Sequence, residues 1–265
     1  MGNRILLFTP MYNCEKQITR VLKQMTMELS NYISEWIIVN NRSTDNGEKV
    51  VIEYLDSEKL PIKIRLLRNE KNYGLGGSHK VAFDYAIKND FDYIIVLHGD
   101  DQGEITNILP YLKDGEYEKY DCLLGARFMK GSKLQGYSKF RTFGNCVYNL
   151  LFSLGCGYKI YDLGSGLNMY KISILKSGFY KKYKDNLIFN YCMIMGSSYY
   201  KHKVKFFPIV WREDDQVSNV KMVNQAITVL KLLGAFVLNK KKFIESEHRE
   251  NTVESYSAEL IYENE

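Results

Sequence analysis

The first half of the chain alternates short apolar runs with segments of helical apolar spacing. Residues 5–8, 36–39 and 93–97 are apolar runs of strand length, and residues 62–66 alternate apolar with charged side chains. Between these runs apolar residues recur every three or four positions, as on one face of a helix. Strands that alternate with helices in this way form a mostly parallel sheet covered on both faces. The sequence therefore predicts an α/β fold of Rossmann-like type.

The second half of the chain is less regular. It contains two segments of helical spacing, at 140–155 and 187–199, and two strand-like segments, at 167–170 and 204–211. An amphipathic helix at 220–238 and three lysines follow, and the chain then becomes Glu-rich and poor in apolar residues. We expect one α/β domain over residues 1–215, an amphipathic helix within 216–243, and an acidic, weakly ordered tail over 244–265.

Charge and cysteine content exclude several classes of protein. A net charge of +5 suits an anionic ligand or a membrane surface, but it falls short of the basic stripe of a nucleic-acid binder. The five cysteines are scattered without C-x-x-C spacing, which is typical of reduced thiols in a cytosol. No apolar run reaches the length of about 18 residues that a membrane-spanning helix needs. We expect a cytoplasmic protein that binds no nucleic acid, or one that lies peripherally on the cytosolic face of a membrane.

Polar segments follow five of the predicted strands. They are the residues at 10–15, 40–45, 69–77, 98–102 and 125–127. One such segment is often an ordinary turn that caps a helix. Five along the carboxyl edge of a sheet favour a ligand site, because open α/β sheets bind ligands there. The glycines at 74, 76 and 77 are spaced too closely for a dinucleotide fingerprint, although small residues before a helix let backbone approach a diphosphate.

The segment His98-Gly99-Asp100-Asp101-Gln102 is the strongest single motif. Two adjacent carboxylates after a buried strand are costly to hold together without a cation. His98, Asp100, Asp101 and Gln102 offer the oxygen and nitrogen ligands that suit Mg²⁺ or Mn²⁺ bridged to phosphates. The alternative is a solvated acidic turn. Zinc is disfavoured because neither a thiolate cluster nor a histidine pair is present.

Taken in order, these motifs resemble those of family 2 glycosyltransferases of the GT-A fold, and most of all the dolichyl- and polyprenyl-phosphate sugar transferases. The resemblance covers about residues 4–221. It is carried by Pro10-x-Tyr12-Asn13-x-Glu15, Asn40 to Asp45, Asn72-x-Gly74, Asp100-Asp101-Gln102, Gly125-Ala126-Arg127, Asp162 to Leu167, and Arg212 with Ser218 and Lys221. Two departures stand out. His98 replaces the first aspartate of the metal motif, and Asn40 and Asn41 replace two loop aspartates, so the base preference of the family cannot be transferred.

The resemblance implies an inverting transfer of a sugar from a nucleoside diphosphate sugar. Residues expected to bind the nucleotide are Pro10, Tyr12, Glu15, Asn40, Asn41, Asp45 and Gly77. Asp100 is expected to hold the metal, which neutralises charge that develops on the leaving β-phosphate. The further catalytic candidates are Arg127, Asp162 and Asp185.

The acceptor decides whether a general base is required. A polyprenyl phosphate is already ionised and needs only groups that hold it. The candidates for that task are Arg127, Arg141, Ser165, Arg212 and Lys221. The alternative acceptor, a sugar hydroxyl of a polysaccharide or lipid-linked glycan, would need Asp162 or Asp185 as base. A non-catalytic sugar-nucleotide binder is a further alternative, and a nucleotidyltransferase is disfavoured because its glycine-rich loop after the first strand is absent.

Two amphipathic segments bear on membrane association. Residues 140–155 suit either the bilayer interface or the core of the protein. For residues 220–238, followed by the lysines at 240–242, we expect peripheral contact with the inner face of a membrane. The sequence does not set the oligomeric state and is compatible with a homo-oligomer.

Overall fold

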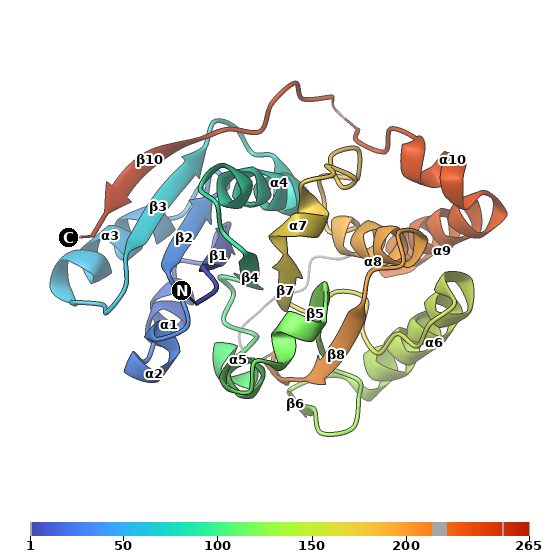
Figure 1. Cartoon of the computed structure of the whole chain (residues 1–265), viewed down its shortest axis with the longest axis horizontal. Helices are drawn as coiled ribbons and strands as arrows, with labels where there is room; N and C mark the ends of the chain where they lie inside the picture. Colours follow the sequence, from blue (N-terminus) through green and yellow to red (C-terminus); the bar gives the residue numbers. More distant parts are fainter. Residues whose placement is uncertain (1, 214–221, 251, 265) are drawn as a thin grey trace.

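The computed structural model of the chain describes residues 2–213, 222–250 and 252–264 (Figure 1). Its centre is an eight-stranded sheet in the order β10-β3-β2-β1-β4-β7-β5-β8. The strands are β1 (Ile5–Met11), β2 (Glu35–Asn40), β3 (Ile64–Asn69), β4 (Tyr93–Leu97), β5 (Cys122–Ala126), β7 (Leu167–Lys171), β8 (Val204–Pro208) and β10 (Ala258–Glu263). β7 runs antiparallel to β4 and β5, β10 runs antiparallel to β3, and the other pairs are parallel. The predicted mostly parallel α/β sheet is confirmed.

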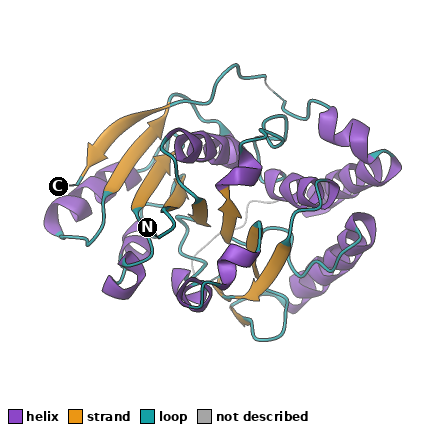
Figure 2. Cartoon of the chain, viewed as in Figure 1, coloured by secondary structure: helices purple, strands orange, loops and turns teal. Residues whose placement is uncertain are grey.

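Helices cover both faces of the sheet (Figure 2). They are α1 (Ile18–Leu22), α2 (Met27–Ser30), α3 (Gly47–Ser57), α4 (Gly74–Lys88), α5 (Leu109–Lys113), α6 (Lys139–Cys156), α7 (Ile172–Leu175), α8 (Phe189–Tyr199), α9 (Met222–Leu238) and α10 (Lys240–Glu245), with short 3₁₀ turns at Ile105–Asn107 and Glu116–Lys119. A small parallel ribbon of β6 (Lys133–Gln135) and β9 (Val210–Arg212) lies beside the main sheet. The helices predicted at 140–155 and 187–199 correspond to α6 and α8.

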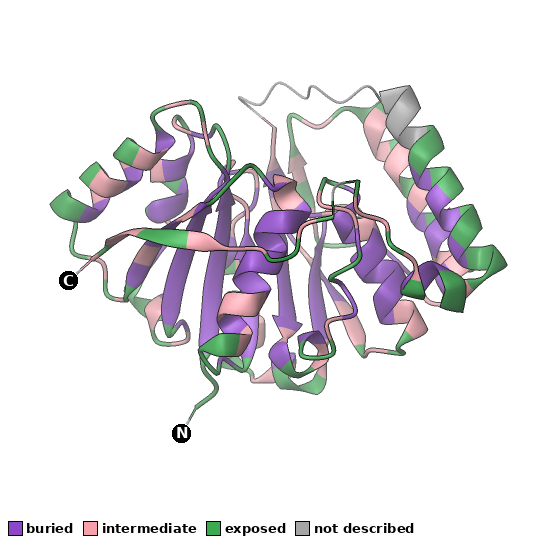
Figure 3. Ribbon diagram, turned by 90° about the horizontal axis from the view of Figure 1, so that it is seen from above, coloured by how far each residue is buried: buried purple, intermediate pink, exposed green. Residues whose placement is uncertain are grey.

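The sheet separates two hydrophobic cores. Successive side chains of a strand point to opposite faces, so Leu6 and Phe8 of β1 enter one core while Ile5 and Leu7 enter the other. The first core is closed by α4 and by α6 to α10, and the second by α1, α2, α3 and α5. Figure 3 shows the buried strands between these layers. Burial of the central strands on both faces explains their continuous apolar runs.

The C-terminal residues differ from the weakly ordered tail expected over 244–265. Residues 258–263 form β10, which pairs with β3 and covers the edge of that strand. Glu263 lies 2.5 Å from Arg65, and Glu259 lies 3.2 Å from Arg68. The glutamates that suggest disorder in the sequence therefore form ion pairs with arginines of β3.

Candidate active site

A cleft of about 370 Å³ opens at the carboxyl ends of β1, β2 and β4. Its walls come from residues within 10–14 after β1, Asn41 after β2, residues within 72–78 at the start of α4, and residues 98–100 after β4, with residues 186–187 before α8. Four of these five segments fall where the sequence predicts a ligand site. Pro10, Tyr12, Asn41, His98 and Asp100 are the predicted site residues that line it.

Glu15 and Asp45 join two loops outside the lining of the cleft. The backbone N–H of Glu15 donates to Asp45 Oδ2 at 2.8 Å, and the N–H of Asn46 donates to Glu15 Oε2 at 3.1 Å. Asp45 Oδ1 also accepts from the N–H of Gly47 at 3.0 Å. Both carboxylates therefore fix the loop after β1 against the loop after β2.

Asn40 and Asn41 have different environments. The side chain of Asn40 donates to Glu48 at 2.7 Å, outside the cleft lining. Asn41 lines the cleft, accepts from the N–H of Tyr73 at 2.8 Å, and donates to Asn72 Oδ1 at 2.8 Å. A carboxylate cannot make that donation, so the hydrogen bond with Asn72 accounts for an amide at position 41.

Asp100 is the carboxylate of the cleft. It follows Gly99, where a Cβ atom would lie 3.0 Å from the carbonyl oxygen of Pro10, so the ends of β1 and β4 approach closely. Burial raises the pKa of Asp100 to about 6, and the neighbouring charge of Asp101 acts in the same direction. A carboxylate held in this way is expected to attract a cation.

Asp101 is held by cations outside the cleft lining. Its backbone adopts a left-handed conformation, with φ of 57°. Its carboxylate lies 2.6 Å from Arg20 Nε and 3.2 Å from Arg212 Nη2. Gln102, the fourth candidate ligand, is also absent from the cleft lining. Asp101 is thus paired with arginines outside the cleft lining, whereas Asp100 faces the cleft.

His98, which also lines the cleft, has a ring nitrogen that is unpartnered in the described part of the chain. Its Nε2 is buried and has no hydrogen-bond partner among the described residues. Burial and the charge of Arg127 lower the pKa of His98 to about 4, so the ring is neutral at pH 7. A neutral imidazole nitrogen can ligate a transition metal or meet a polar group of a ligand.

The residues of the cleft fit a metal that arrives with phosphate. In the described part of the chain, no three His, Cys, Asp or Glu side chains come together as a protein-only metal site. Mg²⁺ is commonly held by one or two carboxylates and by substrate phosphates, with water completing the shell. Asp100 supplies one such carboxylate in the lining of the cleft, where His98 also lies.

Arg127 and Asp162, two catalytic candidates, form a buried ion pair with each other. Arg127 Nε and Nη2 donate to the two oxygens of Asp162 at 2.7 and 2.8 Å, and the backbone N–H of Arg127 donates at 2.8 Å. The guanidinium also lies 4.9 Å from the ring centroid of Trp211. A bidentate pair of this kind fixes both side chains.

The other proposed acceptor residues are engaged as well. Arg141 Nη1 lies 2.5 Å from Glu213, and Arg212 pairs with Asp101 as described above. Ser165 is buried and its hydroxyl donates to the carbonyl of Leu167 at 3.2 Å. Lys221 and Ser218 lie outside the described residues.

Comparison with known proteins identifies the family. The sequence model described as "Glycosyl transferase family 2" matches residues 7–179. The chain belongs to glycosyl transferase family 2. It is therefore a glycosyltransferase.

This family 2 glycosyltransferase is similar in sequence to several known proteins. An uncharacterized protein of Methanocaldococcus jannaschii is 30% identical over 65% of this chain and 73% of its own length. The UDP-N-acetylglucosamine–dolichyl-phosphate N-acetylglucosaminyltransferase of Methanococcus voltae is 25% identical over 65% of this chain and 71% of its own. The dodecaprenyl-phosphate galacturonate synthase of Rhizobium johnstonii is 24% identical over 64% of this chain and 48% of its own. The similarity to polyprenyl-phosphate sugar transferases is confirmed.

Solved structures confirm the predicted GT-A fold. Residues 1–349 of S. aureus TarS, in complex with UDP-GlcNAc, align with a TM-score of 0.58 at 16% identity, over 89% of this chain and 67% of that chain. Glucosyl-3-phosphoglycerate synthase of Mycobacterium tuberculosis, in complex with UDP, aligns with a TM-score of 0.59 at 12% identity, over 90% and 80%. At these identities the likeness concerns the fold alone.

Two site predictions of the glycosyltransferase lie behind the cleft wall. The side chain of Asp185 pairs with Lys80 at 2.7 Å. Gly77 packs against Tyr73 and Tyr256 and does not line the cleft. Sequence reasoning did not assign Leu75, Ser78, Asn186 or Leu187, which do line it. For Leu75 and Ser78 the sequence offers one indication, which is the run of glycines around them at the start of α4.

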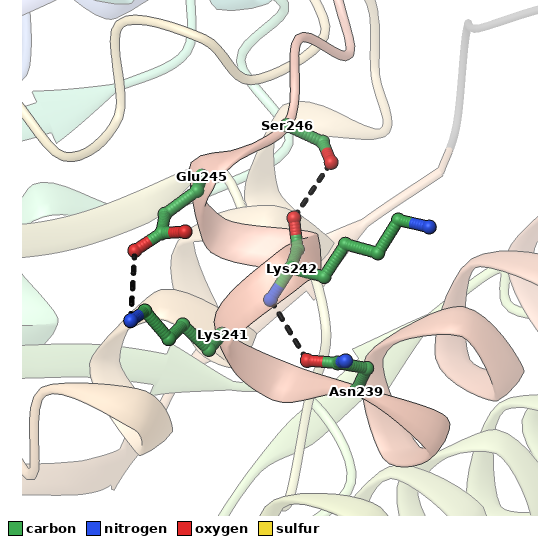
Figure 4. A pocket seen from close by; sticks show the side chains of 5 residues that line it. All are labelled: Asn239, Lys241, Lys242, Glu245 and Ser246. Carbon is green, nitrogen blue, oxygen red and sulfur yellow. Dashed lines mark hydrogen bonds and ion pairs between the residues drawn. The ribbon is translucent and has the colours of Figure 1, made fainter.

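A second hollow lies on α10, between Asn239 and Ser246 (Figure 4). Asn239 Oδ1 accepts from the N–H of Lys242 at 2.9 Å, and Ser246 Oγ donates to the carbonyl of Lys242 at 2.6 Å. These contacts cap the two ends of a short helix.

No described helix combines the length and apolarity needed to span a bilayer.

Proposed function

We propose that this glycosyltransferase transfers a sugar from a nucleoside diphosphate sugar to a polyprenyl-phosphate acceptor, with a divalent metal and inversion at the anomeric carbon. The donor half of this proposal is supported above all by Asp100, a carboxylate of raised pKa that lines the cleft. The names of the two polyprenyl-phosphate relatives support the acceptor half.

The donor is expected to lie along the cleft between Tyr12 and Asp100. Tyr12 is 49% exposed at the rim, where its ring can stack on a base. Mg²⁺ or Mn²⁺ held by Asp100, with His98 as a second candidate, would supply Lewis-acid stabilisation of the leaving diphosphate. The chain's own contribution is to orient the diphosphate and to keep the carboxylate poorly solvated, which strengthens its attraction for a cation.

We assign a phosphate acceptor because both candidate bases, Asp162 and Asp185, form ion pairs within the protein. Asp162 lies between donor groups of Arg127, and Asp185 is held by Lys80. Both carboxylates are therefore engaged by cations, and neither is free to accept a proton from a hydroxyl acceptor. A phosphate acceptor needs no base. The candidate to contact such a phosphate is Arg127, whose Nε and Nη2 bond to Asp162 and Gly164 and leave Nη1 outside those hydrogen bonds.

A lipid acceptor also calls for contact with a membrane, and α6 and α9 offer a surface for it. The exposed face of α6 carries Phe140, Phe143, Val147, Leu150 and Leu154, of which Phe140 is 77% and Leu154 is 74% exposed. α9 packs beside α6 and exposes Ile227, Leu230 and Val237, and the lysines at 240–242 follow it. An apolar face flanked by lysines suits the interface of an anionic bilayer.

The proposed chemistry is tested by thermal unfolding with GDP, UDP, CDP and ADP, each with and without Mn²⁺. The proteins are wild type, Asp100→Asn and, as a matched control, Asp114→Asn at an exposed position. A ligand at about a hundred times its Kd should add about 2.7 kcal/mol to the free energy of unfolding. We expect one diphosphate to do so in wild type and the control, only with Mn²⁺, and not in Asp100→Asn.

The matching sugar nucleotide is then offered with a short polyprenyl phosphate or with a hydroxyl acceptor. Transfer to the phosphate supports the proposal, and transfer to the hydroxyl alone assigns the enzyme to glycan extension. If none of the four diphosphates gives a metal-dependent rise, the donor mechanism is wrong.

A further inference from the structure

Two walls of the cleft touch each other through one carbonyl group. The backbone N–H groups of Gly76 and Gly77, in the first turn of α4, donate to the carbonyl oxygen of Asp185 at 2.7 and 3.3 Å. A Cβ atom at Gly74 would lie 2.4 Å from the same oxygen, and Gly74 has φ of 75°, so this approach requires glycine. The residues that follow Asp185, at 186–187, form the adjoining wall. The position of Asp185 therefore sets how these two walls meet.

The side chain of Asp185 is fixed by two partners behind the cleft. Lys80 Nζ lies 2.7 Å from Asp185 Oδ1, and the hydroxyl of Tyr256 lies 2.8 and 3.0 Å from the two carboxylate oxygens. Lys80 is only 1% exposed, and burial lowers the pKa of its amine. A buried cation is strongly destabilising without its partner, so the group of three is expected to keep this geometry.

Tyr256 belongs to a C-terminal segment that lies beyond the part of the chain matched by the family. Its ring meets the ring of Tyr73, at the start of α4, with 5.3 Å between centroids. The carbonyl of Ser257 accepts from the N–H of Glu70 at 3.2 Å, and β10 then continues along β3. One side chain from the end of the chain thus contacts the supports of both cleft walls.

We propose that Tyr256 is a positioning residue of the donor site. It does not line the cleft. Its hydroxyl holds Asp185, and Asp185 holds the wall at 186–187 against the first turn of α4. The proposal rests on the assignment of this cleft to the donor, and it extends the functional unit to the C-terminal segment.

The test compares Tyr256→Phe with Tyr262→Phe. Both tyrosines lie in the C-terminal segment, and each donates its hydroxyl to a carboxylate. Tyr256 donates to Asp185, and Tyr262 donates to Asp56 on α3, so each variant removes one such hydrogen bond. Hydrogen exchange is measured by mass spectrometry on peptides covering 72–77 and 184–188. We expect exchange of the Gly76 and Gly77 amides to become about tenfold faster in Tyr256→Phe, as for loss of a hydrogen bond to a charged group, and to stay unchanged in Tyr262→Phe.

A second arm measures the Kd of UDP with Mn²⁺, which a merely structural role would change equally in both variants. We expect about a three- to tenfold weaker Kd in Tyr256→Phe alone. Asp185→Asn should reproduce the exchange effect, and the double variant should add little to it.

The two arms separate the two hypotheses. Unchanged exchange in Tyr256→Phe, or equal changes in both variants, overturns the positioning role whether or not UDP binds. Faster exchange together with no binding of any nucleoside diphosphate by wild type supports the positioning of the walls and removes the proposed donor.

Discussion

At the scale of single residues, ionisation of Asp100 lowers the stability of the folded chain. Burial raises its pKa to about 6, above the value of 3.8 for an exposed carboxyl. The folded chain therefore binds this proton more tightly than the unfolded chain. The cost to stability is fully present above pH 6 and disappears as the pH falls below about 4.

Replacement of Asp100 by Asn should remove that cost. In buffer with a chelator we expect Asp100→Asn to raise the free energy of unfolding by about 1–3 kcal/mol at pH 7.5 and to match wild type near pH 4. Urea unfolding at the two pH values measures the difference. A gain that does not depend on pH would contradict the ionised state of the carboxylate.

The pair of Arg127 and Asp162 leads to a second prediction. Asp162→Asn leaves a buried guanidinium without its counter-charge, so we expect a loss of about 3 kcal/mol in the free energy of unfolding. The control is Glu53→Gln, which removes an exposed i,i+4 pair with Lys49 and should cost at most about 0.5 kcal/mol. Similar urea midpoints for the two variants would show that the Arg127 pair is well solvated.

At the scale of elements, α6 carries the prediction for the membrane surface. Phe140→Ser combined with Phe143→Ser should weaken binding to vesicles that contain anionic lipid by about tenfold or more, because two exposed rings no longer enter the interface. Met27→Ser on α2, an equally exposed apolar site, is the control. Co-sedimentation measures binding. Unchanged binding contradicts the bilayer contact, and a loss of dimers on gel filtration would assign the surface to a second copy instead.

The elements also show which features can be predicted from sequence. β1, β2 and β4 are buried on both faces and contain apolar runs, and these runs identify them without knowledge of neighbouring strands. β10 contains Glu259 and Glu263, whose partners Arg68 and Arg65 lie on β3, so its pairing depends on residues far away in the sequence. Likewise the motif around Asp100 predicts a site, but the left-handed backbone of Asp101 and its arginine partners arise from tertiary contacts.

At the scale of the whole molecule, β10 joins β3 from about two hundred residues away in sequence. Closing so long a loop is slow and should follow assembly of the central strands. Deletion of residues 258–265 should therefore raise the unfolding rate by about tenfold or more while it changes the main refolding rate by less than about twofold. Stopped-flow fluorescence in urea measures both rates. A slower refolding phase of matching size would place β10 among the early contacts.

The pairing of β10 with β3 has a consequence for biosynthesis. Tyr256 leaves the ribosome after every segment that lines the cleft. A nascent chain therefore contains the family motifs before it contains the tyrosine that holds Asp185. If Tyr256 positions the walls, translation must run nearly through this sequence before the donor site acquires its final shape. A message cut short just before codon 256 would then yield a protein with all the family motifs and a poorly formed sugar-nucleotide site.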